Sequence, residues 1–302
     1  MRDLAVRNLL LLVVLLAVIG AAGAWVLTGP RKLESDATAG LSGDPVHGEE
    51  VFYAGGCAAC HAAPGAEPGA AMLVLSGGRS FETAFGTFYA PNISPDPAAG
   101  IGAWSLQDLA NAMKRGVTPQ DTHLYPAFPY TTYTRASLQD IADLFAFLRT
   151  LPADTTPSQP QQVGFPFSLR RGIGAWKILY LNASWVEDAP TPELERGRYL
   201  VEALGHCAEC HTPRDALGGL ERDAWMAGAA TADGKGRVPN LTPAALSWTQ
   251  EEIAEYLGSG FTPEFDVAGG EMAEVVQNLS HLSEADRMAI AAYVKALPAV
   301  AD

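Results

Sequence analysis

The chain has 302 residues, of which 48% are hydrophobic and 18% are charged, and its formal net charge is −14. This length allows about two domains. The acidic balance excludes a nucleic-acid-binding protein, because a phosphate backbone requires clustered Lys and Arg and the sequence has no such cluster. An acidic surface serves solubility, and it also suits docking to a basic patch on a redox partner.

An uncharged stretch over residues 9–27 follows Arg2 and Arg7. These 19 residues are long enough to span a bilayer, and the basic flank keeps the N-terminus in the cytoplasm. The alternative is a cleaved signal peptide, with Ala22-Gly23-Ala24 as its small-residue site, although its apolar core is usually shorter. We expect residues 1–28 to be a membrane anchor or signal peptide. Either interpretation exports the rest of the chain to the periplasm. We favour the uncleaved anchor, which holds the haem domains at the outer face of the cytoplasmic (inner) membrane.

Residues 29–44 are rich in Gly, Ser and charge, which is typical of a tether. A predicted helix over residues 45–54 then leads into Cys57-Ala58-Ala59-Cys60-His61, and another over residues 192–203 leads into Cys207-Ala208-Glu209-Cys210-His211. Both motifs match C-x-x-C-H, the attachment signature of a c-type haem. Two thiols three positions apart can bond the two vinyl groups of one haem, and the next imidazole then ligates the iron. The sequence therefore predicts two covalently bound haems c.

Other uses of paired cysteines fit less well. Zinc sites do not require a His directly after each pair, and thioredoxin-like redox pairs occur in a strand-turn-helix context that is absent here. Structural disulfides leave the repeated His unexplained. All four cysteines of the chain belong to the two motifs, which favours haem.

Helical patterns dominate the rest of the first half. Ser105–Lys114 and Ser137–Leu151 each start with a capping Ser, have Asp three residues later and carry an apolar face. Residues 62–102 are rich in Gly and Pro and predict a loop that covers the haem. We assign residues 45–153 to a first haem domain.

A Pro- and Gln-rich passage begins a connector over residues 154–190. Its Arg170 and Arg171 are either solvated on a packed helix or in contact with haem propionates or an acidic edge of a partner. The second haem domain, residues 191–302, ends in a predicted helix over residues 283–297. The fold class is therefore all-α, with two tandem haem domains after an N-terminal transmembrane helix.

The two halves repeat each other. Pro91-Asn92-Ile93-Ser94-Pro95 corresponds to Pro239-Asn240-Leu241-Thr242-Pro243, and in each half a Trp is followed 12 residues later by Gly-x-Thr-Pro. Such an internal match indicates a duplicated domain. The proximal His of a haem needs an acceptor for its second ring nitrogen. We expect the carbonyl groups of Pro91 and Pro239 to be these acceptors.

Electron-transfer haems usually have a second axial ligand, commonly Met. Met272 lies 12 residues after Gly260 in a Gly-rich loop, where a distal ligand would be presented. Met226 and Met288 compete with it, but Met288 fits the apolar face of the last helix. We expect Met272 to ligate the second iron.

In the first half the same count from Gly116 leads to Phe128, which cannot ligate iron. Three interpretations remain for the first haem: His123 is the ligand, another methionine such as Met72 or Met113 reaches the iron, or the sixth position is open. An open position would make the chain a di-haem enzyme or ligand sensor, of a peroxidase or thiosulfate-oxidising type, with His123 as the polar distal group.

Three stretches carry a resemblance: residues 85–93, residues 123–130 and residues 209–214. With them the chain resembles the membrane-associated multihaem cytochromes c that serve periplasmic alcohol, gluconate and aldehyde dehydrogenases, over nearly all of the sequence after residue 45. In single-haem relatives, the proline carbonyl of Pro-Asn-Leu accepts the hydrogen bond of the proximal His. Members often have Met at the position of Phe128, so the ligation of the first haem does not carry over.

The resemblance implies an electron-transfer protein or subunit rather than an enzyme. Its donor would be a periplasmic dehydrogenase, and its acceptor quinone, another cytochrome or an oxidase. Outer-sphere electron transfer requires no acid/base residues, so we expect no catalytic residues.

Overall fold

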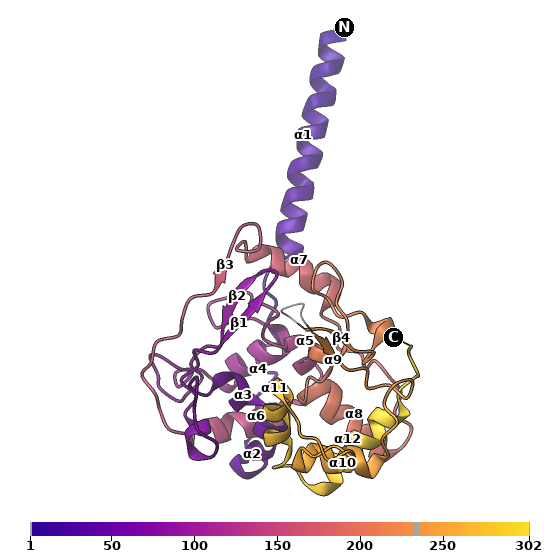
Figure 1. Cartoon of the computed structure of the whole chain (residues 1–302). Helices are drawn as coiled ribbons and strands as arrows, with labels where there is room; N and C mark the ends of the chain where they lie inside the picture. Colours follow the sequence, from indigo (N-terminus) through magenta and orange to yellow (C-terminus); the bar gives the residue numbers. More distant parts are fainter. Residues whose placement is uncertain (1, 232–235, 302) are drawn as a thin grey trace.

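The computed structural model describes residues 2–231 and 236–301. Figure 1 shows helix α1 (Arg2–Leu27) projecting from a two-lobed body, with the N-terminus at its far end. The apolar side chains of α1 are exposed along its length. Among the described residues it is the one helix long and apolar enough to cross a membrane. Its 26 residues include the apolar stretch predicted over residues 9–27.

The first lobe consists of short helices around the first motif. Asp44 caps α2 by accepting a hydrogen bond from the Val46 N–H, and Pro45 suits the first turn, where no N–H donor is needed. Ser105 and Asp108 form the predicted capping box at the start of α4. The elements of this lobe are α2 (Pro45–Ala54), α3 (Cys57–His61), a 3₁₀ turn (Ala70–Leu73), β1 (Ser80–Thr83), β2 (Gly86–Tyr89), α4 (Leu106–Arg115), α5 (Tyr130–Tyr133) and α6 (Leu138–Leu148).

The connector runs along the side of the body that faces α1. Its β3 (Gln162–Val163) pairs with β2 and completes the antiparallel sheet β1-β2-β3. Its α7 (Arg171–Tyr180) lies at the foot of α1 (Figure 1). The β1–β2 hairpin lies within the loop predicted over residues 62–102, where short strands leave too little alternation to be recognised.

The second lobe repeats the first. Its elements are α8 (Pro192–Tyr199), a π-helical turn (Leu200–Leu204), α9 (Ala208–His211), a 3₁₀ turn (Arg222–Ala224), β4 (Ala229–Ala230), β5 (Arg237–Val238), α10 (Gln250–Ser259), α11 (Gly270–Leu279) and α12 (Glu284–Ala296). Helix α8 packs on α12 as α2 packs on α6. Each crossing is close because a glycine faces the partner backbone: a Cβ on Gly48 would lie 2.0 Å from the Asp143 carbonyl oxygen, and one on Gly197 2.0 Å from that of Ala289.

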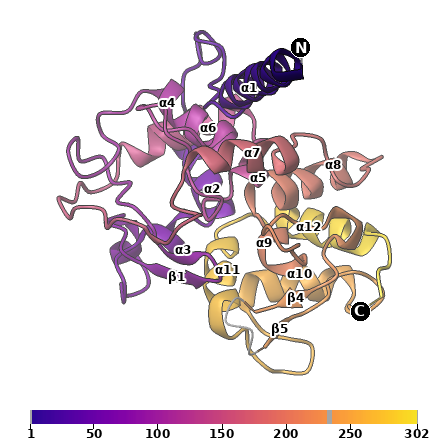
Figure 2. The ribbon, with the colours of Figure 1, turned by 90° about the horizontal axis from the view of Figure 1, so that it is seen from above.

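The two lobes lie side by side in both views and share a packed interface (Figures 1 and 2). The rings of Tyr53 and His281 stack across it with centroids 3.7 Å apart. Arg135 of the first lobe also pairs with Glu202 of the second at 3.7 Å, and neither side chain is more than 6% exposed. The lobes are therefore joined by contacts that include a buried ion pair.

The segment over residues 28–44 is held against the first lobe. The Leu33 N–H donates to Asn111 Oδ1 at 2.8 Å, Gln107 Nε2 to the Glu34 carbonyl at 3.1 Å, and Lys32 Nζ to the Pro119 carbonyl at 3.0 Å. The tether that composition predicted over residues 29–44 thus has contacts with the first lobe that composition did not indicate. Composition reports only local propensity, whereas these bonds join residues far apart in the sequence.

Candidate haem sites

Each C-x-x-C-H motif forms a single helical turn that begins after a left-handed residue. Gly56 precedes Cys57 with φ of 60°, and His206 precedes Cys207 with φ of 40°. Glycine adopts this conformation without strain, whereas His does so at some cost, and such strain concentrates at functional sites. The turn places both cysteines and the following His of each motif on one short element.

The four cysteines are free thiols in the structure. Desolvation raises the pKa of the Cys57 and Cys207 thiols to about 12 each, and that of Cys60 to about 11. Thiol–disulfide exchange requires thiolates, and reactive C-x-x-C pairs have lowered pKa values. The environment of these sulfurs therefore does not suit a redox-active pair, and it is compatible with thioether attachment.

The histidines of the two motifs are oriented by carbonyl groups. His61 Nδ1 lies 2.8 Å from the Pro91 carbonyl oxygen, and His211 Nδ1 lies 2.8 Å from that of Pro239. A carbonyl only accepts, so Nδ1 carries the proton and Nε2 keeps its lone pair for a metal. Burial lowers the pKa of both imidazoles, which favours the neutral, ligating form.

Each proline segment is packed directly on its motif. The Gly77 N–H donates to the His61 carbonyl at 2.7 Å, and the Gly228 N–H donates to the His211 carbonyl at 2.7 Å. Both glycines have positive φ, and a Cβ on either would lie within 2.7 Å of the backbone of the proline segment. These positions require glycine. In both lobes the proline segment therefore packs closely on the motif whose imidazole it contacts.

Met272 lies in the first turn of α11 rather than in a loop. The preceding loops correspond in the two lobes, because the bridge between Val117 and His123 matches that between Phe261 and Val267. Helix α11 also contacts α3 of the first lobe. Sequence reasoning missed this helix because Gly269 and Gly270 begin it without a capping side chain.

Phe128 occupies the corresponding place in the first lobe, where its ring packs against that of Tyr133 with centroids 5.5 Å apart. His123 is buried, and both of its ring nitrogens have protein partners. Nε2 lies 3.0 Å from the Thr28 carbonyl oxygen, and Nδ1 lies 3.1 Å from Lys177 Nζ. A ligand role for His123 stays a prediction, and it would require the contact of the ligating ring nitrogen to break.

Residues in and beside one motif contact residues in and beside the other. His206 Nε2 lies 3.2 Å from the Gly55 carbonyl oxygen, two residues before the first Cys. Thr131 Oγ1 donates to Glu209, inside the second motif, at 2.9 Å. Arg79 Nη1 donates to the Ala59 carbonyl at 2.6 Å and pairs with Glu274 on α11. Sequence reasoning missed His206, although the replacement of Gly-Gly by Gly-His before the second motif was a visible signal.

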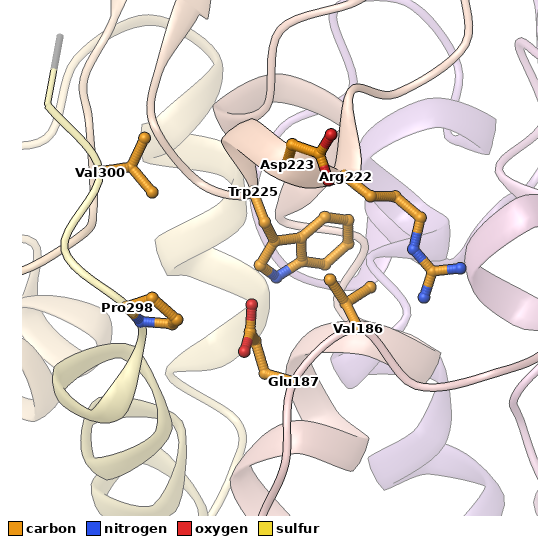
Figure 3. Close-up of a pocket in the computed structure, with 7 residues that line it drawn as sticks. All are labelled: Val186, Glu187, Arg222, Asp223, Trp225, Pro298 and Val300. Carbon is orange, nitrogen blue, oxygen red and sulfur yellow. The ribbon is translucent and has the colours of Figure 1, made fainter.

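A separate surface pocket of about 470 Å³ lies between the connector and the second lobe (Figure 3). It contains no motif residue and mixes acidic and basic side chains. Its lining residues are Val186, Glu187, Arg222, Asp223, Trp225, Pro298 and Val300. The pocket is thus distinct from the two candidate haem sites.

Two oriented imidazoles, each beside a pair of free thiols, form a donor set that fits two c-type haems. Comparison with known proteins agrees with this class. Residues 46–152 match the family model described as cytochrome c, and residues 192–294 match that of the cbb3-type cytochrome c oxidase subunit III. The chain therefore contains two cytochrome c domains, consistent with two covalent c-type haems.

Full-length relatives narrow the class further. The chain is 53% identical over 295 residues to a protein of Cereibacter sphaeroides named diheme cytochrome c-type, covering 97% of this chain and 99% of that protein. It belongs to this family of di-haem c-type cytochromes. It is 36% identical over 84% of its length to the fructose dehydrogenase cytochrome subunit of Gluconobacter japonicus, and 32% identical over 84% to the cytochrome c subunit of a quinone alcohol dehydrogenase of Gluconobacter oxydans. The chain spans about half the length of these two subunits (53% and 54%).

Proposed function

We propose that this di-haem cytochrome is anchored by α1 in the cytoplasmic membrane, with both lobes in the periplasm, and that it carries single electrons from a dehydrogenase to quinone, another cytochrome or an oxidase. The names of relatives that are cytochrome subunits of alcohol and fructose dehydrogenases support the donor. The exposed apolar surface of α1 supports the anchor. Haem, when bound, supplies the one-electron couple of its iron.

The proposed attachment residues are the motif residues themselves. Cys57 and Cys60 hold the first haem with His61 as its proximal ligand. In the second lobe, Cys207, Cys210 and His211 take the same roles. Pro91 and Pro239 would orient the two imidazoles, and Met272 would supply the second protein ligand of the iron in the second lobe.

The observation that carries the proposal is the contact between the two motifs. The Gly55 carbonyl oxygen lies 3.2 Å from His206 Nε2, so the segments that attach the two haems adjoin without intervening solvent. A fixed separation lets an electron pass inside one molecule, with no encounter between proteins. The lobes therefore act as a relay rather than as two independent carriers.

A pulse-reduction experiment tests the relay. The full chain in nanodiscs receives less than one electron per molecule, and the α-bands of the two haems are followed as they relax to equilibrium. We expect a relaxation rate that does not depend on protein concentration, because the transfer is intramolecular. A rate that rises in proportion to concentration would contradict the relay.

A second experiment tests the donor. The oxidised chain in nanodiscs is mixed with the soluble and membrane fractions of its host, and alcohols, sugars and sugar acids are added one at a time. We expect haem reduction only when one substrate and one fraction are present together, and none with a heat-treated fraction. Reduction by no combination would count against a dehydrogenase donor.

One observation favours a second candidate, ligand binding at the first haem. Phe128 stands where the repeat places Met272, and both ring nitrogens of His123 are engaged. An open sixth position would bind carbon monoxide when reduced and cyanide when oxidised. The Phe128→Met variant should then close this position and abolish binding, while Phe145→Met, on the adjacent α6, should not. A first haem that binds neither ligand in the unmodified chain would eliminate this candidate.

A further inference from the structure

The connector contains an exposed apolar surface that solubility does not explain. The buried residues of α7 are Ile173 and Gly174, which mark its inward side. The outward positions are all nonpolar, and they are Gly172, Ala175, Ile178 and Leu179. Ile178 and Leu179 are 62% and 65% exposed. A surface helix of a soluble protein has polar residues on this side.

The loop before α7 extends the same surface. Phe165 is 82% exposed and Leu169 is 58% exposed, and Phe167 between them is 46% exposed. Monomeric soluble proteins rarely gather large apolar side chains in this way, and such patches mark interaction sites. We call the exposed side chains of Phe165, Phe167, Leu169, Ile178 and Leu179 the connector patch.

The connector differs in charge from the rest of the chain, which is acidic. The protein has 34 acidic residues, yet none lies between Asp154 and Glu187. The same interval contains Arg170 and Arg171, whereas its Lys177 is directed into the protein, where Nζ donates to the Gly116 carbonyl. A segment that is basic and apolar within an acidic protein is complementary to a surface of phosphate groups over acyl chains.

Contacts between α7 and the end of α1 determine how far the connector patch lies from the bilayer that α1 would span. Arg171 donates to the Trp25 carbonyl and to Thr28 Oγ1 at 3.1 Å, and its guanidinium lies 4.0 Å from the Trp25 ring centroid. A Cβ on Gly174 would lie 1.9 Å from the Thr28 carbonyl oxygen, so α7 packs directly on the end of α1. When α1 spans a bilayer, its end at Leu27 lies at the bilayer surface, and α7 must lie at the same depth (Figure 1).

We propose that the connector patch is a second membrane contact, which inserts into the headgroup and acyl boundary of the outer leaflet beside α1. The inference rests on the anchor proposed above. Helix α7 also bonds to both lobes: Lys177 donates to the Gly116 carbonyl at 2.7 Å, and Tyr180 donates to Asp215 at 2.6 Å. The patch therefore holds both haem domains at a fixed height and tilt above the bilayer.

Spin labels measure the depth directly. The four natural cysteines are used by haem, so a single added Cys can carry a nitroxide. Labels are placed at Phe165→Cys and Leu179→Cys in the full chain, reconstituted into nanodiscs. Val14→Cys on α1 is the control for a lipid position. Val46→Cys, which is 73% exposed on α2 away from α1, is the control for water.

Collision rates with oxygen, which partitions into lipid, and with a water-soluble nickel chelate are then compared. We expect the labels at 165 and 179 to collide more often with oxygen than with the nickel chelate, as the label at 14 does. The label at 46 should collide more often with the nickel chelate. If 165 and 179 behave like 46 while 14 favours oxygen, the inference is wrong and the anchor stands. If 14 also favours nickel, the anchor proposal fails. If 165 and 179 are shielded from both reagents, a protein covers the patch and the inference is overturned.

Discussion

At the scale of single residues, the thioether of Met272 is expected to set the properties of the second haem. Met ligation raises a haem potential. Met272→Ala should therefore lower the potential of one haem and remove the red charge-transfer band of His/Met ligation. Met288→Leu, on α12, is the matched control and should leave both unchanged. Potentiometry and visible spectra measure the haem potentials and the charge-transfer band. A band that survives Met272→Ala would refute ligation of the second iron by Met272.

Lys177 gives the protein a pH-dependent stability. Burial lowers the pKa of its ammonium group from 10.5 to about 7. Between these values Lys177 binds more protons in the unfolded chain than in the folded chain. The contribution of Lys177 to stability therefore rises with pH from about 7 to about 10.5 and is level outside this window. The neighbouring groups titrate elsewhere, because burial lowers the pKa of His123 and raises that of Tyr130.

The Lys177→Met variant lacks this titration. The difference in unfolding free energy between the unmodified chain and the variant should therefore rise with pH across that window. Denaturant melts at a series of pH values measure it. A difference that is flat with pH would mean that Lys177 keeps an ordinary pKa.

At the scale of elements, two helix crossings depend on glycine. A Cβ on Gly48 would collide with α6, and one on Gly197 with α12. Gly48→Ala and Gly197→Ala should each destabilise their own lobe by about 1–3 kcal/mol through overpacking. Gly172→Ala in α7 meets nothing within 4 Å and serves as the control. It should be neutral or stabilising by up to about 1 kcal/mol. Thermal melts followed by haem circular dichroism measure these differences, and equal stability of all three variants would contradict the dependence of the two crossings on glycine.

The same elements show how far sequence patterns reach. The helix over residues 45–54 and the capping box at Ser105 could be predicted, because caps and apolar periodicity are local signals. The proline acceptors for the two imidazoles could be predicted from the repeat, and both carbonyls lie where expected. Helix α11 could not, because Gly269 and Gly270 are poor helix starters and its packing on the first lobe stabilises it.

Contacts between residues far apart in the sequence could not be predicted either. The partners of His123 are Thr28 and Lys177, which lie 95 and 54 residues away in the sequence. No local pattern connects such positions. The contact of His206 with Gly55 spans 151 residues and also arises only from the packing of the two lobes.

At the scale of the whole molecule, one buried network joins the lobes. Glu202 is fully buried and accepts hydrogen bonds from the Val186 N–H at 2.8 Å and from Tyr293, and it faces Arg135 of the other lobe. Removing its charge leaves the Arg135 guanidinium buried without an anion. Glu202→Gln should cost about 3–5 kcal/mol.

Chemical denaturation with haem circular dichroism measures this cost. The exposed Glu264→Gln is the control and should change stability by less than about 0.5 kcal/mol. We also expect hydrogen exchange to rise on both sides of the interface in Glu202→Gln. A variant as stable as the control would show that the pair contributes nothing to the joining of the lobes.

The bonds that hold residues 28–44 to the first lobe have a consequence for how the protein meets its partners. A free linker of this length could extend roughly 55 Å and let the head sweep the space above the bilayer. Here that freedom is absent, so with the anchor proposed above the molecule would meet its partners only by lateral diffusion in the plane of the bilayer. Its encounter rate with another membrane protein should then follow the viscosity of the lipid, and cooling the bilayer through its gel transition should slow respiration through this cytochrome far more than it slows the redox chemistry itself.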